Sequence, residues 1–422
     1  MRSTILQRKL SMSDKPWLKE PDGWERLGWW TTFLVVFLGA GASAAFCLFN
    51  FRNIQTLPKT CLVLEDNFDT LDLTTWTRDV ELGGFGNGEF QMTTSSPNNS
   101  FTRNGQLYIL PTLTSDVLGR NAIFDGNNFT LSDCTSTNKS ACAVTSNAKL
   151  GTVIQPAQSA RLSTTRSASI RFGKVEVRAK LPRGDWLWPS IWMLPVNETY
   201  GTWPRSGEID IMQSRGNGPT ADPNALIPFG FNTVTSALRF GPLPSLLASI
   251  TGVQSRRRSS SAFAGGFHTY TLEWDEKYIR ISVDGRVNAM LELDFSTGSG
   301  KGTKGDFFAR GGFPDVAVNG TGEVVVQDPW AMGSRSAPFD QDFYLMINLA
   351  VGGTSGWFPD GVGDKPWFDS SATAMRDFAL MQDNWAATWP GDADDRAFRM
   401  SVMSPGLSCA AKIQYLFLLR MQ

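Results

Sequence analysis

Short runs in which apolar and polar residues alternate make up most of this chain, and each run is bounded by glycine, proline, asparagine or serine. Residues 174–178 and 278–283 alternate with period two, which is typical of half-buried β-strands, and the second run ends in Asp284-Gly285, a pair typical of hairpin turns. No long helical period separates these runs, so the pattern predicts an all-β sandwich. Further runs of this kind occupy residues 106–110, 170–180, 190–194, 207–212, 268–274 and 343–351.

The one long apolar run lies near the N-terminus. Residues 29–51 carry no charged side chain and are numerous enough to cross a bilayer as a helix. The preceding segment is rich in Lys and Arg, so the positive-inside rule predicts a type II single-pass protein of the secretory pathway or cell surface, with the C-terminal part lumenal or extracellular. A cleaved signal peptide is the alternative, which the small residues at 39–45 favour and the 26-residue polar lead disfavours.

These patterns predict five parts of the chain. They are a cytoplasmic tail (1–28), a transmembrane anchor (29–51), a stalk (52–60), one continuous domain (61–398) and an atypical tail (399–422). With 39 basic and 40 acidic residues, the composition gives no basic footprint for nucleic acid. The 15 tryptophans favour flat apolar surfaces on which sugar rings stack. Cys134 and Cys142, eight residues apart, predict a local disulfide in an oxidising compartment, whereas Cys61 and Cys409 remain unassigned.

Candidate chemistry lies in the run from Gly207 to Gln213. Glu208 and Asp210 share a face if the strand is regular, and a one-residue bulge after Asp210 would turn Gln213 to the same side. Retaining glycosidases need two carboxyl groups about 5–5.5 Å apart, one as nucleophile and one as acid/base. The alternative is that Glu208 and Asp210 are ordinary polar residues on a solvated strand face.

The surrounding motifs resemble glycoside hydrolase family 16, in its laminarinase and β-1,3-glucan-recognition-protein branch. The resemblance is carried by residues 186–195, 203–212, 267–274 and 348–353. It implies a concanavalin A-like β-jelly-roll sandwich with a concave β-glucan cleft, with Glu208 as nucleophile, Asp210 as assisting carboxylate and position 213 as acid/base. It also implies substrate-binding roles for Asn87, Trp188, Trp203, Arg205 and Asn348. The membrane-anchored layout is similar to that of fungal cell-wall glucan-assembly proteins.

Several of these residues have structural interpretations as well. Trp188 and Trp192 could be core residues, because large aromatics are mostly buried for packing. His268, the only histidine, is more simply a hydrogen-bonded structural residue than a catalytic one. Asp185 or Glu198 could replace the missing acid at position 213.

Two departures from the family pattern shape the functional hypothesis. Gln213 cannot donate a proton at neutral pH, so the sequence predicts β-glucan binding with weak hydrolysis or transglycosylation at best, or a non-catalytic β-glucan-binding protein. Pro405 is expected to interrupt the last strand, which leaves the family's structural calcium doubtful; no organic cofactor and no other metal are expected.

Overall fold

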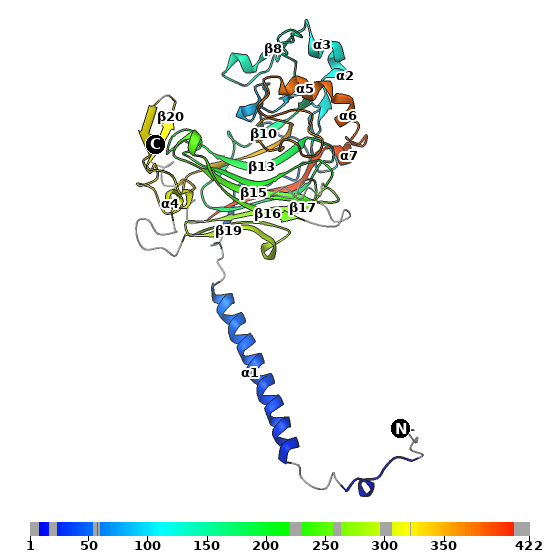
Figure 1. Cartoon of the computed structure of the whole chain (residues 1–422), viewed down its shortest axis with the longest axis vertical. Helices are drawn as coiled ribbons and strands as arrows, with labels where there is room; N and C mark the ends of the chain where they lie inside the picture. The colour runs from blue at the N-terminus through cyan, green and yellow to red at the C-terminus, as the bar shows by residue number, and fades with distance from the viewer. Residues whose placement is uncertain are drawn as a thin grey trace. The chain divides into compact units, whose positions relative to one another are not determined.

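The computed structural model describes residues 8–16, 23–53, 57, 60–219, 230–255, 263–295, 306–320 and 322–408. The chain divides into two units, residues 1–56 and residues 57–422. The first unit contains the short η1 (Met12–Asp14) and the long helix α1 (Gly23–Asn53) (Figure 1). Large apolar side chains are exposed around α1, and its segment Gly23–Phe49 is long and apolar enough to cross a membrane.

The second unit is a sandwich of two antiparallel sheets (Figure 1). We call the first the site sheet; its strand order is β16–β15–β14–β13–β22–β10–β2, with β11 paired to β22. Its strands are β2 (Thr77–Arg78), β10 (Arg161–Ser163), β11 (Ser169–Ile170), β13 (Leu187–Pro195), β14 (Glu208–Ser214), β15 (Thr233–Phe240), β16 (Ala248–Ser255) and β22 (Phe343–Val351).

We call the second the back sheet; its order is β19–β18–β17–β12–β23–β5–β4, with β1 paired to β23. Its strands are β1 (Thr60–Leu62), β4 (Ser100–Thr102), β5 (Leu107–Ile109), β12 (Gly173–Lys180), β17 (His268–Trp274), β18 (Tyr278–Val283), β19 (Ala289–Asp294) and β23 (Phe398–Ser408). Alternate residues of both sheets enter one continuous core, as the period-two pattern predicts. In β12, for example, Val175, Val177 and Ala179 are fully buried.

The last strand corrects one expectation. Pro405 does not interrupt it, because β23 pairs with β12 from Lys180↔Arg399 to Gly173↔Leu407. On its other side β23 pairs with β5 only at 398–400 and with β1 only at 406–408. Pro405 thus lies where one side of the strand has no described neighbour, which is the position a strand tolerates a residue without an N–H.

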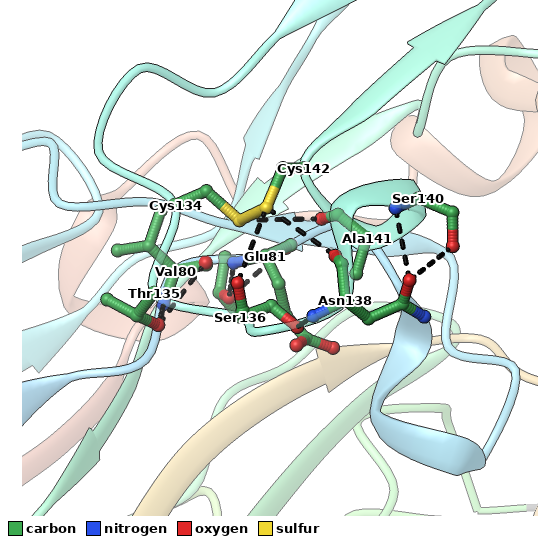
Figure 2. Close-up of a disulfide and its surroundings, with 10 residues drawn as sticks. Val80, Glu81, Cys134, Thr135, Ser136, Asn138, Ser140, Ala141 and Cys142 are labelled. Atoms are coloured by element: carbon green, nitrogen blue, oxygen red, sulfur yellow. Dashed lines mark hydrogen bonds between the residues drawn. A yellow bond between two sulfur atoms is a disulfide. The ribbon is translucent and has the colours of Figure 1, made fainter.

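Smaller elements extend from the sandwich. Cys134 and Cys142, the pair named from the sequence, form a disulfide next to Thr135, whose N–H donates to the Val80 carbonyl and whose Oγ1 accepts from the Val80 N–H (Figure 2). Cys61 is disulfide-bonded as well, and Cys409 lies outside the described residues.

The smaller strands are β3 (Gln91–Thr93), β6 (Thr112–Leu113), β9 (Ala157–Ser159), β7 (Asn128–Thr130), β8 (Ala143–Thr145), β20 (Val316–Asn319) and β21 (Gly322–Val325). The helices are η3 (Gly84–Gly86), α2 (Ser115–Leu118), α3 (Arg120–Phe124), η4 (Lys139–Ala141), η5 (Pro244–Leu246), η7 (Arg286–Asn288), α4 (Phe307–Gly311), α5 (Ala374–Leu380), α6 (Gln382–Ala386) and α7 (Ala393–Arg396).

Candidate functional site

A bulge in β14 decides which side chains face the outer surface of the site sheet. Asp210 pairs with Ala237 of β15, but the next pair is Gln213 with Thr235, so two residues of β14 oppose one of β15. The extra residue changes the parity of the strand. Glu208, Asp210 and Gln213 therefore face the same side, whereas Ile209, Ile211 and Met212 belong to the core.

Neighbouring strands place further polar groups beside these three. Ser190 of β13 lies between Gln213 and Asn348 of β22 in one cross-strand row. Trp192 pairs with Asp210 in the next row, and its Nε1 donates a 2.8 Å hydrogen bond to Asn348 Oδ1. Trp192 is thus a half-buried residue of the site face, not a core residue.

The acidic residues Glu208 and Asp210 form a pair with Arg239 of β15. Arg239 Nε donates a 2.8 Å hydrogen bond to Asp210 Oδ2 and lies 3.4 Å from Glu208 Oε1. Trp203, in the loop before β14, donates from Nε1 to Glu208 Oε2 at 2.8 Å. Asp210 is fully buried and the Glu208 side chain is 13% exposed, so the pair lies at the floor of the site and not on an outer wall.

Burial and, after it, the adjacent Asp210 charge raise the pKa of Glu208 to about 8, against the opposing effects of Arg239 and the Trp203 hydrogen bond. Asp210 Oδ1 is buried and has no donor among the described residues unless Glu208 is protonated. A proton on Glu208 shared with Asp210 satisfies that oxygen. The raised pKa of Glu208 is consistent with a carboxyl group that keeps its proton at neutral pH beside Asp210.

Gln213 is 6% exposed, and its side-chain amide has no hydrogen-bond partner within the described part of the chain. An amide at this position can donate to or accept from a sugar oxygen but has no acidic proton to transfer. The third position is therefore suited to binding and not to acid/base catalysis.

Aromatic and cationic groups border the site on the β10 side. The Arg161 guanidinium lies 3.9 Å from the Phe85 ring centroid and 5.0 Å from that of Trp192. Arg161 also pairs with Asp79 at 3.1 Å, which fixes the guanidinium between the two rings. Phe85 and Arg161 could not be assigned from the sequence, because loop and strand come together only in the folded sheet.

Trp188 does not present an open platform. It is 6% exposed, and the ring of Trp357 stacks on it at 5.0 Å with an interplanar angle of 11°. The Arg215 guanidinium lies 4.1 Å from the Trp357 centroid and donates to the Trp357 carbonyl at 3.0 Å. The half-buried Trp357, not Trp188, therefore provides the aromatic surface at this end of the site.

Comparison with known proteins agrees with this architecture. A beta-1,3-glucan-binding protein of Penaeus monodon is 38% identical over 85% of this chain and 92% of its own length, and the family model for glycosyl hydrolases family 16 matches residues 130–299. The chain belongs to glycosyl hydrolase family 16. Among other relatives, glucan endo-1,3-beta-glucosidase A1 of Niallia circulans is 29% identical over 69% of this chain and 34% of its own length.

Several further relatives are longer than this family 16 chain, which spans 62% of the beta-1,3-glucan-binding protein of Tenebrio molitor. The laminarinase from Rhodothermus marinus has the same fold, with a TM-score of 0.50 and 24% identity over 83% of this chain and 99% of the enzyme. The family therefore contains both proteins named as glucan-binding and proteins named as glucanases.

The remaining residues named from the sequence lie at the edge of the site or away from it. Asn87 Nδ2 donates to Glu89 Oε1 at 3.0 Å, and burial raises the pKa of Glu89. Arg205 Nε donates to the Pro242 carbonyl at 2.7 Å, and no described contact joins Arg205 to the acidic pair. It lines a side cavity of about 310 Å³ with residues 324–329.

The structural interpretation of His268 is favoured, since its Nδ1 lies 2.7 Å from Asp284 Oδ2 on the back sheet.

Neither substitute for the missing acid reaches the third position. The Asp185 carboxylate hydrogen-bonds to Thr388 and Asn217, and Glu198 is exposed in a loop. No described contact joins either carboxylate to Gln213. The described residues also contain no group of three or more His, Cys, Asp or Glu that could hold a metal ion.

Proposed function

We propose that this family 16 protein binds β-1,3-glucan across the outer face of the site sheet and releases little or no sugar from it. The observation that carries this proposal is Gln213, an amide at the position where the bulged strand turns its third polar side chain to the surface. General acid/base assistance contributes about 10²–10⁴-fold to proton-transfer chemistry, and position 213 carries no carboxyl group to provide it. Hydrogen bonding to sugar oxygens remains possible.

The groups that would hold a glucan are polar and aromatic, as sugar recognition requires. Trp203 is 41% exposed beside Glu208, and Trp192 and Trp357 are half-buried at the two sides of the Asn348 row. Aromatic rings of this kind supply large apolar surface to the C–H face of a sugar, while Asn348 and Gln213 supply directional hydrogen bonds.

A pelleting assay tests the proposal. Full-length protein in detergent is mixed with insoluble β-1,3-glucan, and the bound protein and the released reducing ends are both measured. We expect saturable co-sedimentation with sugar release at the background rate, and Arg178→Ala on the exposed back sheet serves as a matched control that binds equally. Reducing ends that accumulate with protein concentration, or the absence of binding, would contradict the proposal.

A weak glucanase or transglycosylase is the second candidate, and the retained acidic pair favours it. Both acids are present at the floor of the site, which supports a nucleophile at Glu208 and an assisting carboxylate at Asp210. End-labelled β-1,3-glucan oligosaccharides distinguish this candidate from a pure binder. Transglycosylation would lengthen some labelled chains and shorten others, whereas a binder leaves their length distribution unchanged.

We further propose that α1 anchors the protein as a type II membrane protein with residues 57–422 outside the cytoplasm. The apolar character of Gly23–Phe49 supports a membrane span. Four Asn-x-Ser/Thr acceptor asparagines are exposed, namely Asn98, Asn128, Asn138 and Asn197. Expression in a eukaryotic host should therefore yield an endoglycosidase-sensitive form that stays with membranes in alkaline carbonate, and an unglycosylated soluble product would contradict this topology.

A further inference from the structure

The floor of the site carries a cation that contacts both acids. Arg239 Nε lies 2.8 Å from Asp210 Oδ2 and 3.4 Å from Glu208 Oε1. Arg239 pairs directly with Glu208 in the β14–β15 ladder, so the register of two buried strands keeps the guanidinium there. The side chain of Arg239 is 27% exposed against 0% for Asp210, so solvent screens this interaction only in part.

A cation here opposes the charge that glycoside cleavage requires. In the retaining reaction a carboxylate oxygen bonds to the anomeric carbon while the bond to the leaving oxygen breaks and the acid residue protonates that oxygen. The transition state resembles an oxocarbenium ion, so negative charge close to the anomeric carbon stabilises it. Two ionised acids would supply two negative charges, and Arg239, in contact with both, cancels one of them.

We propose that Arg239 is a second, independent determinant of low turnover, because its charge neutralises the acidic pair. Both oxygens of Glu208 are also engaged, Oε1 with Arg239 and Oε2 with Trp203 Nε1, which weakens Glu208 as a nucleophile. It follows that Gln213→Glu, which restores the acid, does not restore glucan cleavage by itself. This inference rests on the proposed function, since it explains why a protein that binds glucan does not cut it.

The test compares variants that differ only in the charge at position 239. Full-length Gln213→Glu, Gln213→Glu/Arg239→Gln and Gln213→Glu/Arg239→Lys are assayed for release of reducing ends from soluble β-1,3-glucan. Removing one charge about 5 Å from the reacting carbon at an effective dielectric constant of about 20 corresponds to an acceleration on the order of 10²-fold. We therefore expect the rate of the Gln variant, measured above the rising limb of its pH profile where Glu208 is ionised, to exceed that of Gln213→Glu by about that factor, and the rate of the Lys variant to remain close to that of Gln213→Glu.

Three results would overturn the inference. They are full activity in Gln213→Glu alone, equal activity of the Lys and Gln variants, and no gain in any variant that folds. Arg239→Met in the Gln213→Glu background is a second neutral substitution, which keeps the test decisive if Arg239→Gln does not fold. Circular dichroism and the pelleting assay establish folding and glucan binding for each variant.

A pH profile separates charge from packing. Because Arg239 lowers the pKa of Glu208, its removal moves the rising limb of the pH–rate profile to higher pH in the Gln variant than in the Lys variant. If Arg239 acts only through packing, the rising limb of the pH–rate profile has the same position in both variants. If the wild type and all variants fail to pellet with glucan, the proposed function fails; if they bind and charge removal brings no gain, only the role of Arg239 fails.

Discussion

Trp203 Nε1 donates a 2.8 Å hydrogen bond to Glu208 Oε2, which joins an exposed aromatic ring at the rim of the site to a carboxyl group at its floor. The bond fixes the ring of a residue that is 41% exposed. It also favours the ionised form of Glu208, because an N–H donor stabilises a carboxylate. The Trp203 side chain therefore has an ordered position at the rim of the site and also influences the charge of the acidic pair.

Substitution of Trp203 separates these two roles. Trp203→Phe keeps a ring but removes the donor, so we expect glucan affinity within about threefold of wild type and a higher pKa for Glu208. Trp203→Ala removes the ring, and the loss of about 1–1.5 kcal/mol of aromatic contact predicts an affinity about tenfold lower. Titration calorimetry with a β-1,3-glucan oligosaccharide measures the affinities of both variants. Equal affinities for the Phe and Ala variants would show that the ring does not contact the sugar.

The raised pKa of Glu208 predicts a pH-dependent stability. Since the folded pKa of about 8 lies above the ordinary value of 4.5, the folded state binds the extra proton between these pH values, and Glu208 therefore stabilises the protein less as pH rises from about 4.5 to 8. Glu208→Gln mimics the protonated form and is free of this loss. We expect the melting temperature of the variant relative to wild type to increase by ~2 °C or more between pH 5 and pH 8.

Differential scanning fluorimetry of both proteins at five or six pH values measures this difference. Other buried acids, such as Glu89, change both curves equally and cancel in the comparison. Melting curves that stay parallel across this range would show that Glu208 is ionised throughout.

A buried lysine holds the segment that carries Trp357. Lys365 Nζ is fully buried and donates to the Phe358 carbonyl at 2.8 Å and to Asp360 and Asp369 at 2.6 and 2.5 Å. Lys365→Met leaves the two carboxylates without their cation. We expect a loss of about 2–3 kcal/mol in the free energy of unfolding, below the usual cost of a fully buried pair because Asp360 is 40% exposed.

Chemical denaturation of Lys365→Met beside the exposed-lysine control Lys149→Met measures this loss. The same change should weaken glucan binding severalfold, because Trp357 directly precedes Phe358. If Lys365→Met matches the control in both stability and affinity, the ion pairs do not fix this segment.

The Cys134–Cys142 disulfide closes a short loop beside Val80 (Figure 2). A loop of this length stabilises the folded state by about 2.5 kcal/mol in the chain-entropy model. The double variant Cys134→Ser/Cys142→Ser should therefore melt several degrees lower, while Cys47→Ser, which removes a free thiol, should not. A melting temperature unchanged in the double variant would show that this loop unfolds independently of the sandwich.

The sequence was sufficient to predict those features of the site that depend only on the order of residues along one strand. The alternation around Glu208 and Asp210 could be interpreted from β-geometry, and a bulge after Asp210 was the only way to bring Gln213 to the same face; the ladder contains that bulge. The two-sheet architecture followed in the same way from many short alternating runs.

Contacts between residues far apart in the sequence could not be predicted from the sequence. Arg239 lies 29 residues beyond Asp210, in a strand that itself contains no acidic residue. Only the pairing of β14 with β15 brings Arg239 to the two acids. Trp188 could be identified as an aromatic of the site face, but its cover by Trp357 depends on a loop 169 residues later. Pro405 lies within β23 because a strand tolerates proline where one side is unpaired, and the sequence does not reveal which strand side is unpaired.

The most direct test of the account is the fate of a glucan that has bound. Full-length protein is titrated with a β-1,3-linked glucose hexamer by calorimetry, and the same sample is analysed by mass spectrometry after a day at neutral pH. The account predicts saturable binding that Trp203→Ala weakens, with the hexamer recovered intact. Accumulation of shorter or longer oligosaccharides would contradict the account. Binding that stays the same when residues of the site face are substituted would also contradict it.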